Sequence, residues 1–311
     1  MKLRNVLGLA AGTLGATAVA NRLLSASADE FEPVVAGDQG TYRWRGLDVP
    51  YADRGAPADP DVVMLHGVAA AASGHEFRRV AEDLATDHHV LVPDLPGFGH
   101  SDRPPLLYSA ALYVTFVTDA LRDLSDEPPT VVASSLTGGY AAVAARDVDV
   151  DELVLVCPGS GMGAGRRRWL RALLRSPVLG EGLFNLLVSR PSLRHFHRDH
   201  GVADVDRLPA AVLNYEWLTA HQPGARFAPA SFLSGDLDLD ADLGDVLADL
   251  DVPVTLVWGR EADVAPLERG REWADRADAR LVVVDDAKLL PHVEHPAAFL
   301  DVLRDDVLAV Q

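Results

Sequence analysis

Hydrophobic and polar positions follow a regular rhythm along most of this chain. Short apolar runs, rich in valine and leucine, are each followed by a stretch with apolar residues at helical spacing. The strand-like runs are 61–67, 89–94, 130–135, 152–158, 252–259 and 280–285. Apolar strands that alternate with helices predict a mostly parallel sheet covered by helices on both faces.

Two regions depart from this rhythm. Residues 40–55 alternate and contain turn residues, which predicts an antiparallel hairpin. Between about 159 and 250 no central strand is visible, and apolar residues recur at helical spacing. The pattern therefore predicts an α/β core formed by 40–160 and 250–311, with a helical cap inserted at 161–249.

The N-terminal segment, 1–28, is an apolar leader. Its apolar stretch, 6–20, has about 15 residues, whereas a membrane-spanning helix needs about 20. It fits a secretory signal with small residues at 18–20, a short anchor built on the pair Gly8 and Gly12, or an amphipathic or buried leader helix. We expect membrane contact through this leader, and a cytoplasmic or membrane-associated protein.

The net charge of the chain limits the classes of partner that it can bind. A net charge of −18 argues against nucleic acid, whose phosphates would be repelled. The 34 aspartates outnumber the 12 glutamates, and Lys2 and Lys288 are the only lysines. This composition resembles that of proteins from salt-accumulating archaea, so we expect a halophilic protein; an ordinary acidic protein is the alternative.

Metal and cofactor signals are weak. Cys157 is the only cysteine and lies in an apolar run, so neither a disulfide nor a cysteine metal cluster is predicted. His195, His197 and His200 could hold a metal, but a basic helical face explains them better. The Asp-rich stretch 234–251 lacks an EF-hand pattern. We expect no metal and no organic cofactor, because no glycine-rich dinucleotide loop follows the first parallel strand.

Three ordered segments resemble the α/β-hydrolase fold family. They are "LHG" at 65–67, "PDLPGFGHSDRP" at 93–104 and "PHVEHPAAFL" at 291–300. The resemblance covers the chain from about Tyr42 to its C-terminus. It implies an α/β-hydrolase fold, with a cap over an active site that takes a small-molecule substrate.

The stretch "ASSLTG" at 133–138 is similar to the family's nucleophile elbow, a tight turn between strand and helix. The resemblance implies Ser135 as the nucleophile. A second register, fixed on Gly138 and Gly139, puts Leu136 in that place. In the first register the backbone amides of Val68 and Leu136 would form the oxyanion hole. The absence of an aspartate sets the chain apart from family members with a carboxylate nucleophile.

The other two members of the triad depart from the family pattern. The usual acid position is Ala262, and Asp263 follows it directly, with Glu261 as an alternative. The usual base position is Leu289, and the nearest downstream imidazole is His292. We therefore predict Ser135, Asp263 and His292 as the catalytic residues.

Two functions follow. The first is hydrolysis of an ester-like bond of a small molecule through an acyl-Ser135 intermediate. The second is a catalytically impaired protein of the same fold that binds a small apolar ligand or a partner under its cap. A histidine nitrogen close to the Ser135 hydroxyl would favour the first.

Overall fold

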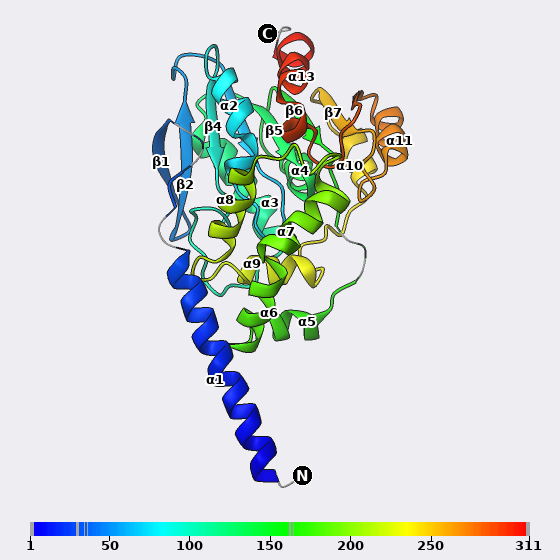
Figure 1. The fold of residues 1–311 in the computed structure, drawn as a ribbon. Coiled ribbons are helices and arrows are strands. Elements are labelled where there is room, and N and C mark those ends of the chain that lie inside the picture. Colours follow the sequence, from blue (N-terminus) through cyan, green and yellow to red (C-terminus); the bar gives the residue numbers. More distant parts are fainter. Residues whose placement is uncertain are drawn as a thin grey trace.

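The computed structural model describes residues 3–28, 31–33, 35, 37–161, 163 and 165–308, with the backbone only for 3–12 and 306. Its centre is an eight-stranded sheet in the order β1-β2-β4-β3-β5-β6-β7-β8 (Figure 1). The pairs β1–β2 and β2–β4 are antiparallel, and every other pair is parallel. The predicted α/β-hydrolase architecture is confirmed.

The strands are β1 (Asp38–Trp44), β2 (Leu47–Arg54), β3 (Asp61–Leu65), β4 (His89–Pro93), β5 (Thr130–Ser134), β6 (Glu152–Val156), β7 (Val254–Gly259) and β8 (Arg280–Val284). The core helices are α2 (Arg78–Leu84), α3 (Ala110–Leu124), α4 (Ser135–Ala144), α10 (Leu243–Ala248), α11 (Leu267–Ala277), α12 (Pro291–Glu294) and α13 (Pro296–Asp301). The short turns η1 (Gly74–Phe77) and η3 (Val302–Val307) flank α2 and α13. The predicted hairpin at 40–55 is thus confirmed as β1 and β2.

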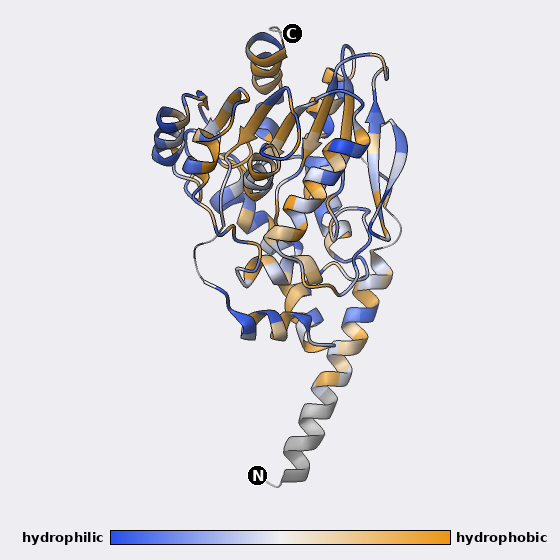
Figure 2. Cartoon of the chain, turned by 180° about the vertical axis from the view of Figure 1, so that it is seen from behind, coloured by the Kyte–Doolittle hydropathy of each residue, from blue (hydrophilic) through white to orange (hydrophobic). Residues whose placement is uncertain are grey.

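The alternation of side chains along the strands builds a core on each face of the sheet. In β3, Val63 and Leu65 join the core beneath α3, α4, α10 and α11. Val62 and Met64, on the opposite face, join the core beneath α2 and α13. Figure 2 shows the central strands as mostly hydrophobic, as expected for a sheet that is buried on both faces.

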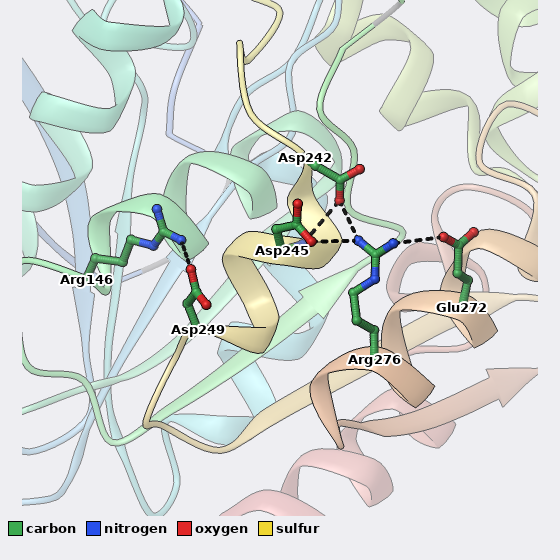
Figure 3. A network of polar contacts seen from close by, with 6 residues as sticks. All are labelled: Arg146, Asp242, Asp245, Asp249, Glu272 and Arg276. Atoms are coloured by element: carbon green, nitrogen blue, oxygen red, sulfur yellow. Dashed lines mark hydrogen bonds and ion pairs between the residues drawn. The ribbon is translucent and has the colours of Figure 1, made fainter.

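Arginine–carboxylate pairs fasten α10 to the core. Arg276 of α11 contacts Asp242, Asp245 and Glu272 at 2.9, 3.1 and 3.4 Å (Figure 3). Arg146, beyond the end of α4, contacts Asp249 at 2.8 Å. These side chains are largely exposed, so the pairs illustrate how the surface carries its many aspartates next to arginines.

The region between β6 and α10 is helical, as the pattern predicts. It contains α5 (Arg168–Arg175), α6 (Leu179–Leu187), α7 (Arg190–Phe196), the π-helical turn η2 (His197–Gly201), α8 (Ala210–Ala220) and α9 (Phe227–Leu233). These helices share a small core with Ala28, including Phe184, Val188 and Trp217. They lie beyond one end of the sheet (Figure 1), although the exact limits of the cap stay a prediction.

The leader forms one helix, α1 (Leu3–Ser27), that packs against α6 and projects away from the body (Figure 1). Among the described residues, no helix combines the length and apolar character that crossing a membrane requires. Membrane contact therefore stays a prediction.

Two local expectations can be compared with the structure. The pattern predicts a helix over 138–146, whereas α4 begins at Ser135 and ends at Ala144. That prediction is wrong at the start, because the chain reverses directly after β5 and leaves no loop between strand and helix. Cys157 is buried as expected, and burial raises the pKa of its thiol to about 12.

Candidate active site at the carboxyl ends of the strands

The turn between β5 and α4 holds Ser135 in a left-handed backbone conformation, with φ of 54°. A non-glycine residue in this region costs of the order of 1–3 kcal/mol and persists only where its surroundings impose it. Ser135 is half-buried, whereas its neighbours Ser134 and Leu136 are buried. Of the two registers, the structure places Ser135 at the turn and Leu136 inside α4.

Small residues allow this turn to pack closely against neighbouring loops. A Cβ atom on Gly67 would lie 3.1 Å from Cβ of Ser135 and 3.2 Å from Oγ of Ser134. A Cβ atom on Gly138 would lie 3.0 Å from Pro158. The glycine after His66 therefore brings the end of β3 directly against Ser135.

Two backbone amides next to this turn, those of Val68 and Leu136, make no hydrogen bond among the described residues. The N–H of Val68 makes no hydrogen bond to any described residue. Leu136 is the second residue of α4, a position whose amide has no acceptor within its helix. Both residues are buried. An oxyanion hole needs free, preorganised N–H donors, and these two amides are donors of that type.

His66 fixes the loops around these amides. Its Nδ1 donates to Gly67 O at 2.7 Å, and its Nε2 accepts from the Leu95 amide at 2.9 Å. The hydroxyl of Thr137 donates to His66 O at 2.7 Å. Both nitrogens of His66 are thus occupied, and the ring together with the backbone carbonyl of this residue joins the end of β3 to the loop after β4 and to α4.

Asp263, the predicted acid, pairs with a histidine of the cap. Its carboxylate accepts from Nδ1 of His200 at 3.1 and 3.3 Å and from the Val264 amide at 2.8 Å. Burial tends to raise the pKa of Asp263, but the contacts with His200 and the Val264 amide outweigh burial and hold this pKa below its ordinary value. Asp263 is therefore a carboxylate at neutral pH, oriented toward η2.

The backbone of His200 lies beside the usual base position. The amides of Leu289 and Leu290 donate to His200 O and Gly201 O at 3.4 and 3.1 Å. Lys288 Nζ donates to two further carbonyls of the cap, those of Arg198 and Asp199, at 2.7 and 2.8 Å. The cap turn η2 is thus attached to the loop in which the family pattern places its histidine.

His292, the predicted base, is completely buried. Its ring stacks on Phe77 at 4.9 Å between centroids and lies near Phe299. Its Nε2 is 3.5 Å from Oε1 of Glu76, an ion-pair contact, and neither ring nitrogen makes a hydrogen bond among the described residues. Among the described residues, no hydrogen bond or ion pair joins Ser135, Asp263 and His292 to one another.

Glu76 was not singled out from the sequence, yet it connects His292 to the oxyanion region. Its Oε1 accepts from the Gly67 amide at 3.0 Å. Burial tends to raise the pKa of Glu76, but His292, His66 and the Gly67 amide outweigh burial and lower it below the ordinary value. The carboxylate thus holds the backbone that precedes Val68.

The histidines considered as metal ligands point to different carboxylates. His195 contacts Asp199, His197 contacts Glu216, and His200 contacts Asp263. No group of three metal-binding side chains occurs within the described ranges. The sequence placed His200 on a helical face; its contact with Asp263, 63 positions away, depends on the tertiary fold.

Cavities near this site are small. One of about 40 Å³ lies between η1 and the cap and is lined by Glu76, His197, Glu216 and Leu290 among others, but not by Ser135. A larger cavity of about 520 Å³ lies at the opposite, amino ends of the strands, where Asp61 and Asp151 are found. The substrate site that the resemblance implies beneath the cap, at Ser135, stays a prediction.

Comparison with known proteins gives a consistent result. Residues 62–302 match the model of the Alpha/beta hydrolase family. A 2-hydroxy-6-oxononadienedioate/2-hydroxy-6-oxononatrienedioate hydrolase of Cupriavidus pinatubonensis is 28% identical over 269 residues, which cover 79% of this chain and 86% of that protein. A pimeloyl-[acyl-carrier protein] methyl ester esterase of Aeromonas salmonicida is 25% identical over 252 residues, or 79% and 94% of the two chains.

Solved structures agree on the fold. The 2-hydroxy-6-oxo-6-phenylhexa-2,4-dienoate hydrolase of Rhodococcus sp. strain RHA1 superimposes with a TM-score of 0.71 at 22% identity, covering 87% of this chain and 98% of that one.

Proposed function

Because the chain belongs to the Alpha/beta hydrolase family, we propose that it is a hydrolase that cleaves an ester-like bond of a small molecule through an acyl-Ser135 intermediate. The observation that carries this proposal is the left-handed Ser135 at the start of α4, next to the amides of Val68 and Leu136, which have no partner among the described residues. A backbone strained at one serine, against free amide donors, is what acyl transfer requires.

In the proposed reaction the Ser135 hydroxyl attacks the carbonyl carbon of the substrate and transfers its proton to an imidazole. The oxyanion that forms accepts hydrogen bonds from Val68 and Leu136, and each such donor contributes about 10²–10³-fold to kcat. The imidazole then protonates the leaving alcohol. Water attacks the acyl-serine by the same route, which releases the acid and restores Ser135.

For the base we propose His200, paired with the predicted acid Asp263. Its Nδ1 faces the carboxylate, which leaves Nε2 without a partner among the described residues. This is the orientation that a triad requires, since the acid holds one nitrogen and the other takes the proton. The cap would then supply from η2 the imidazole that the core lacks at Leu289.

His292 is the base predicted from the sequence, and the same experiments test it against His200. Its contacts favour a different role. It faces Glu76, which in turn holds the Gly67 amide, so we propose that His292 positions the oxyanion strand rather than takes a proton.

The second candidate function is binding of a small apolar ligand without turnover. Two observations favour it. Leu289 occupies the usual base position, and no hydrogen bond joins the Ser135 hydroxyl to an imidazole within the described residues. Binding and hydrolysis would use the same place on the fold, so activity has to be measured directly.

A fluorophosphonate probe separates the two functions, because it reacts only with an activated serine. We expect labelling of the native protein and of the Ser134→Ala control, and none of Ser135→Ala. Ser134 is the matched control, since it is adjacent and completely buried. A panel of p-nitrophenyl esters of increasing chain length then measures turnover. Absence of both labelling and turnover in a folded native protein would leave ligand binding as the function.

A further inference from the structure

The end of the molecule formed by α1, α5 and α6 exposes an unusual amount of apolar surface. Eleven of the thirteen large apolar side chains exposed among the described residues lie on α1, α5, α6 or the loop at 106–107. The most exposed ones are Val19, Leu23, Leu107, Trp169 and Leu186. Trp169 is 68% exposed and Leu186 is 71% exposed. We call this end of the molecule the apolar–basic face. Contiguous exposed apolar surface of this kind marks an interaction site.

The parts of this face are fastened to one another. Asn21 of α1 donates to Val178 O at 2.9 Å and accepts from Asn185 of α6 at 3.1 Å. A Cβ atom on Gly182 would lie 2.8 Å from Thr17, so this glycine allows α1 and α6 to approach closely. Arg175 of α5 donates to the Leu106 carbonyl at 2.7 Å. The apolar side chains are therefore displayed by one connected surface.

The charge of this face is opposite to that of the rest of the chain. The net charge of the protein is −18, yet residues 166–190 contain six arginines and one glutamate, and residues 1–28 contain no acidic residue. Arg166 pairs with Asp240, and Arg171 pairs with Asp236. Arg22, Arg167 and Arg168 are exposed and have no carboxylate partner among the described residues.

We propose that the apolar–basic face docks on the surface of a lipid bilayer that carries anionic headgroups. Trp169 and the leucines of α6 would enter the interface, where aromatic and aliphatic side chains are buried, while Arg22, Arg167 and Arg168 meet lipid phosphates. The long acidic remainder of the protein would point away, because an anionic surface repels it. The protein docks on the bilayer without crossing it, in keeping with the helices described above.

Charge also distinguishes a bilayer from a second copy of this chain. A symmetric dimer through this face would bring the same arginines of both copies together and leave them facing one another. An anionic bilayer instead supplies the opposite charge over the whole face. A dimer that covers the face by an asymmetric contact is the competing outcome, and the experiment below detects it.

The fluorescence of Trp169 reports on this docking directly. The chain has five tryptophans, and the other four are at most 7% exposed. We expect vesicles of phosphatidylglycerol and phosphatidylcholine to shift the emission to shorter wavelength, and brominated lipids to quench it. Vesicles of phosphatidylcholine alone should do so much less. The same vesicles should carry the full-length protein upward in a density gradient.

Charge-reversal variants test the specificity of the face. Arg167→Glu/Arg168→Glu should lower the fraction bound to anionic vesicles by about tenfold or more. Arg79→Glu/Arg271→Glu makes the same change in net charge at two exposed arginines elsewhere, and should bind as the native protein does. Circular dichroism, at the lowest KCl concentration that retains the fold, confirms that each variant is folded.

Three results would overturn the proposal: no binding of the native protein to anionic vesicles, equal loss of binding in both double variants, or a dimer in solution by light scattering that shields Trp169 without lipid. None of these measurements uses a substrate, so their outcome is independent of the proposed hydrolase activity.

Discussion

Two imidazole–carboxylate pairs lie beside the loop that follows β8, and they differ in almost every respect. His200 and Asp263 are joined by hydrogen bonds of 3.1 and 3.3 Å, are 41% and 52% exposed, and come from the cap and from the loop after β7. His292 and Glu76 lie 3.5 Å apart, are 0% and 14% exposed, and belong to the interior. The first pair is accessible to solvent, and the second is enclosed by the interior.

The difference indicates how two pairs of similar chemistry divide their roles. A general base has to reach the proton that it removes and then release it, so a free nitrogen near solvent suits it. A buried pair is costly to break, and so it suits a scaffold. The contact between Glu76 and the Gly67 amide supports that role for the second pair.

The largest effect is expected from His200→Ala. Because loss of a triad member leaves only the oxyanion hole and binding, we expect kcat to fall by about 10³-fold or more, with little change in thermal unfolding. Steady-state kinetics on the best ester of the panel measures this. The control is His195→Ala, an exposed histidine of the neighbouring helix that pairs with Asp199.

Leu289→His in the His200→Ala background sharpens the same test. It puts an imidazole at the usual base position, and a partial recovery of kcat would show that the missing group is a base. If His200→Ala leaves kcat unchanged while His292→Ala abolishes it in a folded protein, the base is His292, as the sequence predicts.

The next largest effect concerns the buried pair. His292→Ala removes a fully buried ring from Phe77 and leaves the Glu76 carboxylate without its partner. We expect the free energy of unfolding to fall by about 3–5 kcal/mol. Urea titration followed by circular dichroism measures it. His295→Ala, which loses a contact to the Asp286 carbonyl, should cost much less; an equal loss would argue against a special role for the buried pair.

A smaller effect is expected from pH. Because the pKa of Glu76 is lower in the folded protein than in the unfolded chain, its charge stabilises the fold above the unfolded pKa of about 4.3. That contribution is lost as pH falls through the folded value. Glu76→Gln should therefore be less stable than the native protein at pH 7, by about 1 kcal/mol, and the difference should vanish in acid. A difference that is constant with pH would contradict this assignment.

The smallest effects are expected from salt. The exposed ion pairs of Arg276 each contribute about 0.2–1 kcal/mol to the free energy of unfolding. The stability that Arg276→Gln loses should therefore disappear in molar KCl, where salt screens these pairs. The loss of stability in His292→Ala should persist in molar KCl, because His292 is buried.

The melting temperature of the native protein should rise with KCl, because salt screens the repulsion among its carboxylates. Equal melting temperatures in dilute and molar KCl would count against the halophilic interpretation.

The sequence by itself determined the architecture. Valine and leucine runs separated by helical patterns predicted six of the eight strands in order, the alternation at 40–55 predicted the other two, and the interval without strands predicted the helical cap. These features follow from local periodicity, because a strand or helix must bury its apolar face whatever its neighbours are. The same local pattern drew attention to the serine at the end of β5.

Only the tertiary structure decided which groups meet at the carboxyl ends of the strands. The pairing of Asp263 with His200 joins the core to an insertion 63 positions earlier, and that of His292 with Glu76 spans 216 positions. The apolar–basic face likewise forms as one surface only where α1 packs beside α6. Contacts of this kind depend on how the helices and loops pack in three dimensions, whereas periodicity records only which side of each element is buried.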